Sequence, residues 1–222
     1  SPDYAESTTS SDAWLNVKAG TDAALAMAMG HVILKEYYID KETPYFKEYA
    51  KEFTDMPFLV RIEDINGAVQ PGRFLNAKDL GSKEDGADFQ TVLIDETTNE
   101  IVVPNGTMGD RHPNPQKWKL RLENRNTGAK IDPRLSVFDQ RQDVTVVKLP
   151  YFGDEEHEGV IERAIPTITV QTVDGPVKVT TVYDLILANY GIDRGIGGEV
   201  ATSYTDDTPY TPTWQEKITG VK

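Results

Sequence analysis

The residues from Lys18 to Tyr38, KAGTDAALAMAMGHVILKEYY, constrain the fold more than any other stretch of this sequence. Ala23 to Leu34 form a run of twelve residues without a formal charge when His31 is neutral. Such a run is too short to cross a membrane and has the length of a buried helix. Small residues recur on several sides of this predicted helix, so neighbouring backbones can approach it closely. We therefore expect the helix to lie against a sheet and to be covered on its outer side as well.

A short apolar run and a turn precede this helix. Trp14 to Val17, WLNV, is bounded by turn residues, which predicts a buried strand. Ala19-Gly20 forms the predicted turn. Thr21 or Asp22 is expected to cap the helix, because either side-chain oxygen can accept from the exposed N–H groups of the first turn. Strand, glycine turn and helix start, in this order, face ligands in open α/β sheets.

Asp22 limits which ligand could bind there. A helix N-terminus favours phosphate or another anion, but an aspartate at that position would oppose phosphate. A carboxylate does match guanine, whose N1–H and exocyclic amine are two parallel donors. On this motif alone, a plain helix-capping aspartate is the alternative interpretation.

The rest of the chain changes from helical to strand-like periodicity after Pro57. A second helix is predicted from Thr43-Pro44, and its apolar face is expected to contain Tyr45, Phe46, Tyr49, Ala50 and Phe53. The middle of the chain contains four hairpin signals. They lie at Asn66-Gly67, within TVLIDETTNEIVVP, at Asn126-Thr127-Gly128 and at Asp174-Gly175, and DVTVVKLPYFG adds a further strand. Helices return at TTVYDLILANYG, closed by Gly191, and at TPTWQEKITG, between Thr211-Pro212 and Gly220.

Composition excludes several classes of function. The chain has 23 basic and 36 acidic residues and a net charge of −13, which argues against nucleic acid and anionic lipid as partners. It has no cysteine, which removes disulfides, thiolate nucleophiles and iron–sulfur ligation. No secretory signal or membrane span is apparent, so we expect no direct membrane insertion. The first residue is Ser1 and no element precedes it, from which we expect a piece of a longer chain.

The remaining candidates for chemistry have plainer explanations. His31 is expected to be a hydrogen-bonded core histidine, and His112 to lie in an exposed loop. His157 lies among Asp154, Glu155, Glu156 and Glu158, which could hold a cation loosely, but consecutive ligands favour a solvated loop. A dinucleotide-binding glycine loop directly follows a strand. GIDRGIGGEV follows a predicted helix, so we expect it to be a plain glycine-rich loop. No P-loop or catalytic triad signature is present.

Several segments, in order along the chain, carry a resemblance to a known enzyme family. The first is SPDYAESTTSSDAWLNVKAGTDAALAMAMGHVILKEYY, which contains the turn Gly-Thr-Asp. The others are PYFKEYAKEFTDMPFLV, PGRFLNAKDLG, VPNGTMG, PYFG, VTTVYDLILANYG and YTPTWQEKITGV. Together they resemble the molybdopterin oxidoreductases of the dimethyl-sulfoxide-reductase type, and within them the catalytic alpha subunits of the respiratory nitrate reductase branch. Gly-Thr-Asp alone is shared by the superfamily, whereas the ordered set is specific to that branch.

The resemblance implies a fragment of a much longer subunit. Such a subunit carries molybdenum bound by two molybdopterin guanine dinucleotides and a 4Fe-4S cluster whose ligands are not in this chain. It reduces nitrate to nitrite with electrons from quinol, passed through an iron–sulfur beta subunit and a membrane quinol-oxidising subunit. It belongs to a membrane-associated complex, with the cytoplasmic side expected in most bacteria and an outward-facing arrangement as the archaeal alternative. The fragment by itself is expected to be inactive.

The resemblance also implies part of a cofactor site. In the wider family, the loop after one strand and the Gly-Thr-Asp turn after the next both touch one guanine dinucleotide. The matching positions here are Ser1, Pro2, Asp3, Tyr4, Gly20, Thr21 and Asp22. The family turn is often preceded by proline, where this chain has Ala19. No catalytic residue and no metal ligand is carried over.

The expected fold class is α/β: part of a dinucleotide-fold cofactor domain that carries a β-rich (α+β) insertion with several hairpins. Residues 1–57 are expected at the edge of the domain that binds molybdopterin guanine dinucleotide. Residues 58–179 form the expected insertion, and residues 180–222 a helical return segment of the same domain. Two alternatives stay open, a sister molybdenum oxidoreductase acting on selenate, chlorate or a hydrocarbon, and a non-catalytic binding or scaffold module.

Overall fold

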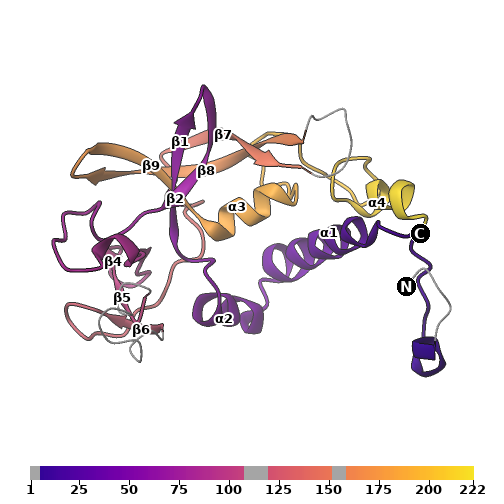
Figure 1. Ribbon diagram of the computed structural model, residues 1–222, viewed down its shortest axis with the longest axis horizontal. Coiled ribbons are helices and arrows are strands. Elements are labelled where there is room, and N and C mark those ends of the chain that lie inside the picture. Colours follow the sequence, from indigo (N-terminus) through magenta and orange to yellow (C-terminus); the bar gives the residue numbers. More distant parts are fainter. Residues whose placement is uncertain (1–5, 108–119, 152–158) are drawn as a thin grey trace. The chain divides into compact units, whose positions relative to one another are not determined.

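A computed structural model of the chain describes residues 6–107, 120–151 and 159–222 (Figure 1). Its helical elements are η1 (Glu6–Ser10), α1 (Asp22–Ile33), η2 (Leu34–Asp40), α2 (Pro44–Phe53), η3 (Ala87–Phe89), α3 (Val182–Asn189) and α4 (Pro212–Thr219). Its strands are β1 (Leu59–Ile65), β2 (Ala68–Phe74), β3 (Leu93–Ile94), β4 (Ile101–Val102), β5 (Pro104–Asn105), β6 (Arg121–Asn124), β7 (Asp143–Pro150), β8 (Val160–Thr172) and β9 (Gly175–Thr181). No described helix has both the length and the apolar character needed to cross a membrane.

The chain divides into two compact units, each assembled from separated stretches of sequence. The first, which we call the terminal unit, comprises Ser1–Thr43, Leu149–Arg163 and Leu187–Lys222. The second, the sheet unit, comprises Pro44–Lys148 and Ala164–Ile186.

A five-stranded sheet with the order β2-β1-β9-β8-β7 dominates the sheet unit. β1 pairs antiparallel with both β2 and β9, and β9 pairs antiparallel with β8. Asn66 and Gly67 both have positive φ, of 58° and 81°, as the tight turn between β1 and β2 requires. The Asp64 carboxylate accepts a hydrogen bond from the Gly67 N–H at 2.8 Å, which stabilises this turn. The hairpins predicted at Asn66-Gly67 and at Asp174-Gly175 are both confirmed.

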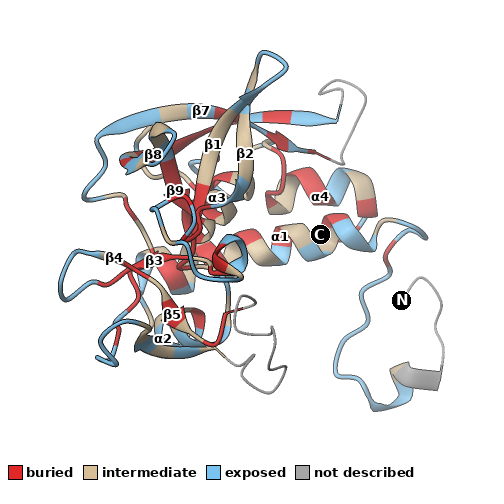
Figure 2. Cartoon of the chain, turned by 60° about the vertical axis from the view of Figure 1, so that its left-hand side comes forward, coloured by how far each residue is buried: buried red, intermediate tan, exposed pale blue. Residues whose placement is uncertain are grey.

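Two smaller strand pairs, β3-β4 and β5-β6, complete the sheet unit, and the first confirms the hairpin predicted in TVLIDETTNEIVVP. The third predicted hairpin is also present, because Glu123 pairs with Lys130 across a turn in which Gly128 has φ 71°. Side chains from several strands and loops form one hydrophobic cluster: Leu59, Leu75, Val92, Ile94, Val137, Val170 and Val179. Figure 2 shows buried residues gathered along the central strands, with exposed residues at the hairpin tips.

A buried aspartate fixes the start of α3. Asp184 accepts hydrogen bonds from the Ser136 hydroxyl at 2.6 Å, the Val137 N–H at 2.9 Å and the Thr181 hydroxyl at 2.9 Å. In return, the Thr181 hydroxyl oxygen accepts from the Asp184 N–H at 3.1 Å, as a helix cap does. These bonds connect the helix start to the loop that contains Val137, a residue of the core cluster.

In the terminal unit, α1 packs against α4. The Lys18 N–H donates to the Thr219 carbonyl at 3.0 Å, which joins the segment before α1 to the last residue of α4. The predicted boundaries of α4 are confirmed, since Thr211 caps its start, Pro212 is its first residue and Gly220 ends it with φ 77°. The core of this unit is aromatic: its buried or half-buried rings in mutual contact are Tyr151, Tyr190, Tyr210 and Trp214.

Two predictions about the N-terminal region are wrong. Trp14 to Val17 do not form a strand, and only Val17 is buried. The buried face of α1, with Ala24, Ala28 and His31, belongs to a unit in which its main packing partner is α4, and among the described residues no sheet packs extensively against it. A strand needs a hydrogen-bonded neighbour, and no described segment pairs with residues 14–17. The mixed helices and strands fit an α/β class, but these residues do not confirm a dinucleotide fold.

The outer side of α1 is apolar, but no described residue covers it, so the covering that we expected is not seen among the described residues. Ala23, Ala26, Met29 and Ile33 are exposed, and their spacing of three to four residues places them on one side of the helix. Beyond Ile33 the helix widens into the π-helical η2, which the sequence did not predict.

Candidate functional site

The segment from Lys18 to Asp22 forms a tight turn that leads directly into α1. The Lys18 carbonyl accepts hydrogen bonds from both the N–H of Thr21, at 3.2 Å, and its hydroxyl, at 2.7 Å. Gly20 has φ 81°, a left-handed conformation that side chains beyond glycine rarely adopt. No heavy atom lies within 4 Å of the position that a Cβ would take at Gly20, so the turn needs glycine for its backbone angle and not for lack of space.

The predicted capping by Thr21 or Asp22 is wrong in its details. Thr21 occupies the N-cap position, but its side chain makes no cap hydrogen bond. Its backbone, with φ −113° and ψ 12°, is not in the extended conformation typical of an N-cap, and its hydroxyl donates back to the Lys18 carbonyl. Asp22 is the first residue of the helix and not its cap. A carboxylate in the first turn is still favoured by the helix dipole.

The Asp22 side chain is exposed, and no described residue forms a hydrogen bond or an ion pair with its carboxylate. Both carboxylate oxygens are therefore available to a ligand. The open space beside Gly20 adds room for one to approach this turn. These two acceptor oxygens fit a ligand that presents two N–H groups, and their negative charge does not fit a phosphate.

The seven predicted cofactor residues are only partly described. Gly20, Thr21 and Asp22 are consecutive and lie together at the start of α1. Ser1, Pro2, Asp3 and Tyr4 lie outside the described residues. His112 and the acidic cluster around His157 also lie outside them.

His31 is the hydrogen-bonded core histidine that the sequence predicted. Its Nδ1 lies 2.7 Å from the Tyr190 carbonyl oxygen, and since a carbonyl only accepts, Nδ1 carries the hydrogen. Burial lowers the pKa of His31, the hydrogen bond to Tyr190 opposes this, and the positive charge of Arg163 lowers the pKa further. His31 is therefore neutral near pH 7.

His31 also lines a small pocket that the sequence did not predict. The pocket has a volume of about 220 Å³, and its lining residues are His31, Lys35, Asp40, Ala201, Thr202, Ser203 and Tyr204. Lys35 forms an ion pair with Asp40 at its edge. The hydroxyl-bearing segment comes from far along the chain, and no local pattern marks it as a neighbour of α1.

The glycine-rich stretch GIDRGIGGEV forms a loop above a buried arginine. Arg163 is fully buried, and its Nη1 donates to the Glu199 carbonyl. Burial lowers the pKa of Arg163, which the nearby Glu199 carboxylate partly opposes. A Cβ at Gly191 would lie 3.2 Å from Nη2 of Arg163, so glycine leaves room for the guanidinium. The interpretation of the stretch as a plain loop agrees with this geometry.

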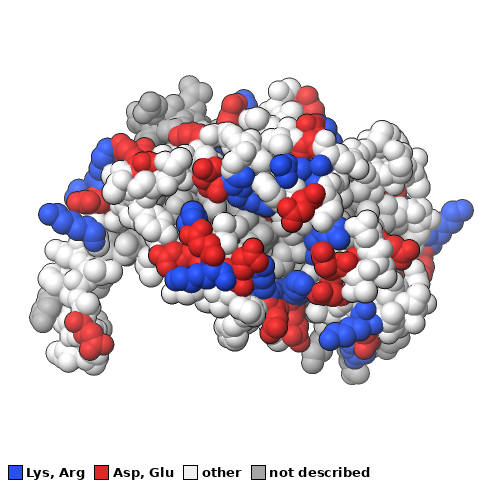
Figure 3. Space-filling view, turned by 180° about the vertical axis from the view of Figure 1, so that it is seen from behind, with Lys and Arg blue, Asp and Glu red and all other residues white. Residues whose placement is uncertain are grey.

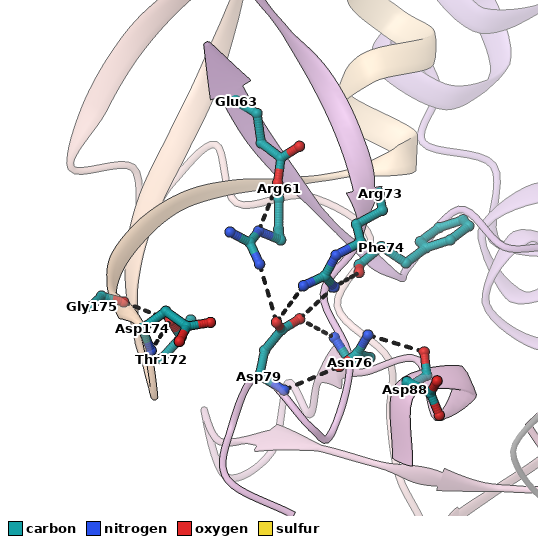
Figure 4. Close-up of polar contacts among 10 residues, drawn as sticks. All are labelled: Arg61, Glu63, Arg73, Phe74, Asn76, Asp79, Asp88, Thr172, Asp174 and Gly175. Carbon is teal, nitrogen blue, oxygen red and sulfur yellow. Dashed lines mark hydrogen bonds and ion pairs between the residues drawn. The ribbon is translucent and has the colours of Figure 1, made fainter. Parts of the chain in front are cut away.

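The sheet unit contains one dense charged cluster, centred on Asp79 (Figure 4). Arg73 binds both carboxylate oxygens of Asp79, at 2.5 and 2.7 Å, and Arg61 adds a hydrogen bond at 3.1 Å. The Asn76 N–H also donates to this carboxylate at 3.1 Å, and the Asn76 side-chain oxygen accepts from the Asp79 N–H. Burial alone raises the pKa of Asp79, but the bonds from Arg73 and Asn76 outweigh it and hold the pKa below its ordinary value.

Arg61, Arg73 and Asn76 all bind Asp79, and the Asn76 side chain also donates to the Asp88 carbonyl at 3.0 Å. The cluster therefore holds together β1, the end of β2 and the loop that follows. We interpret this cluster as a structural network. Among the described residues, no group of three or more histidine, aspartate or glutamate side chains is arranged to hold a metal ion. On the face drawn in Figure 3, basic side chains lie beside acidic ones and form no basic patch.

Comparison with known proteins identifies the family. No protein-family profile matches the chain. It is 48% identical over 222 residues to the nitrate reductase alpha chain of Bacillus subtilis, a match that covers all of this chain and 18% of that protein. It is 42% identical over 233 residues to the respiratory nitrate reductase 1 alpha chain of Escherichia coli, which covers 99% of this chain and 19% of that protein. The chain belongs to the nitrate reductase alpha-chain family.

The match covers only part of each relative, and it is weaker for related reductases of other oxyanions. The chain spans about a fifth of the length of the curated relatives it matches. The perchlorate reductase subunit alpha of Dechloromonas aromatica is more distant, with 34% identity over 131 residues that cover 58% of this chain. The expected resemblance to molybdopterin oxidoreductases is thus confirmed, and nitrate reductases are the nearer branch.

Proposed function

We propose that this chain is part of the catalytic subunit of a molybdenum-dependent nitrate reductase, and that it contributes one wall of a guanine-dinucleotide site. In the whole protein, the bound cofactor, molybdenum bis(molybdopterin guanine dinucleotide), would supply the redox chemistry that converts nitrate to nitrite. Electrons would come from quinol through an iron–sulfur beta subunit and a membrane subunit. A 4Fe-4S cluster in the same subunit would take its ligands from outside this chain, which has no cysteine.

The observation that supports the site is the exposed carboxylate of Asp22, which no described residue binds. Its two oxygens would accept from guanine N1–H and the exocyclic amine, and Gly20 and Thr21 would hold the carboxylate at the start of α1. Ser1, Pro2, Asp3 and Tyr4 belong to the same proposal. We assign no catalytic residue and no metal ligand to this segment, so the chain alone is expected to be inactive.

Asp22→Ala in the full-length subunit tests the guanine proposal. Removing a charged acceptor of two hydrogen bonds is expected to cost about 2–3 kcal/mol of cofactor binding, or roughly 30- to 150-fold in affinity. The measurement is the GMP released by acid from the purified protein, relative to total protein, after extended dialysis. Asp12→Ala is the matched control, since Asp12 is also an exposed aspartate but begins no helix. Equal GMP content in the two variants would rule out Asp22 as the guanine acceptor.

The choice of nitrate rests on a separate observation, the higher identity and fuller coverage of the nitrate reductase relatives. It is tested by comparing nitrate, chlorate and selenate as oxidants of reduced viologen with the intact enzyme. We expect the highest kcat/KM for nitrate. A preference for another oxyanion would leave the Asp22 proposal standing, and a full-length protein without molybdenum would favour the scaffold alternative.

A further inference from the structure

The outer side of α2 is an uncovered face in which aromatic and acidic side chains alternate. It comprises Tyr45, Glu48, Tyr49, Glu52 and Phe53, whose spacing of three and four residues places them on one side of the helix. We call these five residues the α2 outer face. All five are exposed in the described structure, where Tyr45 has 69%, Tyr49 49% and Phe53 64% of its surface accessible. Figure 2 shows exposed residues, drawn in pale blue, along α2.

The three rings form a continuous apolar surface along the helix. The ring centroids of Tyr45 and Tyr49 are 6.4 Å apart, and those of Tyr49 and Phe53 are 5.2 Å apart. The sequence predicted an aromatic face for α2, but the helix packs into the sheet unit through its other side, where Ala50 is buried. Single exposed apolar residues are ordinary, whereas a stripe of three adjacent rings marks a surface for another protein segment.

The carboxylates of this face decide the chemistry of the segment that covers it. Glu48 and Glu52 form no hydrogen bond or ion pair with any described residue. The lysines of α2 are half-buried on the other side of the helix, where Lys51 pairs with Asp132 at 2.6 Å. A partner must therefore bring its own cations. Arginine fits best, because its planar guanidinium can bind a carboxylate and also stack on a tyrosine or phenylalanine ring.

The same carboxylates argue against other occupants. Nucleic acid and anionic lipid would be repelled. A second copy of this face would place Glu48 and Glu52 opposite their own equivalents, which costs free energy at an interface.

The length of the related alpha chains indicates where the segment that covers the α2 outer face comes from. The relatives carry about four-fifths of their length outside the region that this chain matches. A segment on the same polypeptide binds at a high effective concentration, so even a weak contact would be occupied. We propose that the α2 outer face binds an arginine- or lysine-bearing segment from another part of the same alpha chain.

Site-specific photo-cross-linking in the intact enzyme tests this proposal. p-Benzoylphenylalanine replaces Tyr49, which is half exposed and whose ring lies at the centre of the face. After irradiation of the purified complex, mass spectrometry identifies the captured peptide. We expect a peptide of the alpha chain outside these 222 residues, with an arginine or lysine within about four residues of the attachment point. The same probe at Phe89, an exposed ring remote in sequence from α2, should give a different product or none.

A variant without the two carboxylates of the α2 outer face provides a second test of the proposal. Glu48→Gln together with Glu52→Gln keeps the shape of the face and removes its charge, so the cross-linking yield at position 49 should fall at least fivefold at low salt. Glu100→Gln, at an exposed carboxylate elsewhere in the sheet unit, should leave the yield unchanged. The proposal is overturned by capture of another subunit, by a captured peptide without a basic residue, by absence of a product, or by a yield that does not respond to the double substitution.

Discussion

At the scale of single residues, the charged groups of this chain serve two different purposes. Asp79 and Asp184 are buried and have hydrogen bonds on both carboxylate oxygens, so they hold loops and strand ends in place. Asp22, Glu48 and Glu52 are exposed and have no partner among the described residues. The first group stabilises the fold, and the second is available to ligands or other parts of the protein.

Asp79→Asn is expected to destabilise the sheet unit. The substitution removes the charge that Arg73 and Arg61 face, while both guanidinium groups remain. Loss of one partner of a largely buried pair costs up to about 3–5 kcal/mol, and the half exposure of Arg73 lowers our expectation to about 2–3 kcal/mol. Urea unfolding measures the change, with Asp85→Asn at an exposed position as the control. Equal midpoints for the two variants would contradict a stabilising role for the cluster.

At the scale of elements, local patterns predicted the hairpins and most helices. Asn66-Gly67 and Asp174-Gly175 require positive φ and therefore mark their turns in the sequence, as Gly220 marks the end of α4. What failed was the assignment of Trp14 to Val17, because a strand depends on a neighbour that no local pattern encodes. Which side of α2 is buried also could not be predicted, since an aromatic face that packs in the core and one that is exposed have the same sequence pattern.

The start of α4 provides a test at this scale. Thr211 is fully buried, its hydroxyl donates to the Asp206 carbonyl at 2.6 Å, and its oxygen accepts from the Trp214 N–H at 3.2 Å. Thr211→Ala should lower the free energy of unfolding by about 1–2 kcal/mol, because both bonds are lost and the N–H stays buried. Thr211→Ser keeps the hydroxyl and should recover most of the loss in thermal unfolding. Equal loss in the two variants would mean that the methyl group, and not the cap, is important.

The candidate site was predictable only in part, and for a physical reason. The Gly-Thr-Asp turn is local, so its glycine angle and its helix start follow from the sequence. The pocket beside His31 joins α1 to residues 201–204, and the Asp79 cluster joins two strands to a loop, so neither has a local signature. The capping role expected for Thr21 was wrong because its backbone, with φ −113° and ψ 12°, does not take the extended conformation typical of a capping residue.

At the scale of the whole molecule, stability should fall on acidification in two steps. The lowered pKa of His31 means that its contribution is present above about pH 6.5 and is lost below it, since the unfolded chain then binds the proton more readily. The pKa values of Asp79, Asp95, Asp143 and Asp206 are also lowered. Their contributions are present above about pH 4 and are lost as the pH falls further.

Acid also relieves the self-repulsion of a chain with a net charge of −13, which acts in the opposite direction. The local bonds should dominate, because they act at contact distance while repulsion is screened within about 8 Å at physiological salt. Urea midpoints at pH 7.5, 5.5 and 3.5 measure the two steps, and His31→Gln should remove the first. Stability that rises from pH 7.5 to 3.5 would show that repulsion dominates instead.

The terminal unit is assembled from three separated stretches of the chain, so it cannot fold until the last of them has been synthesised. α1 reaches its partners only when distant residues exist, since His31 bonds to a carbonyl 159 positions later. At 5–20 residues per second, synthesis leaves roughly 10–30 s between the two. During that interval both apolar sides of α1 are open to solvent, and the sheet unit is also incomplete, because its last residue is Ile186. A newly made helix with this composition therefore needs protection by a chaperone, or by an earlier part of the polypeptide, before its own unit closes.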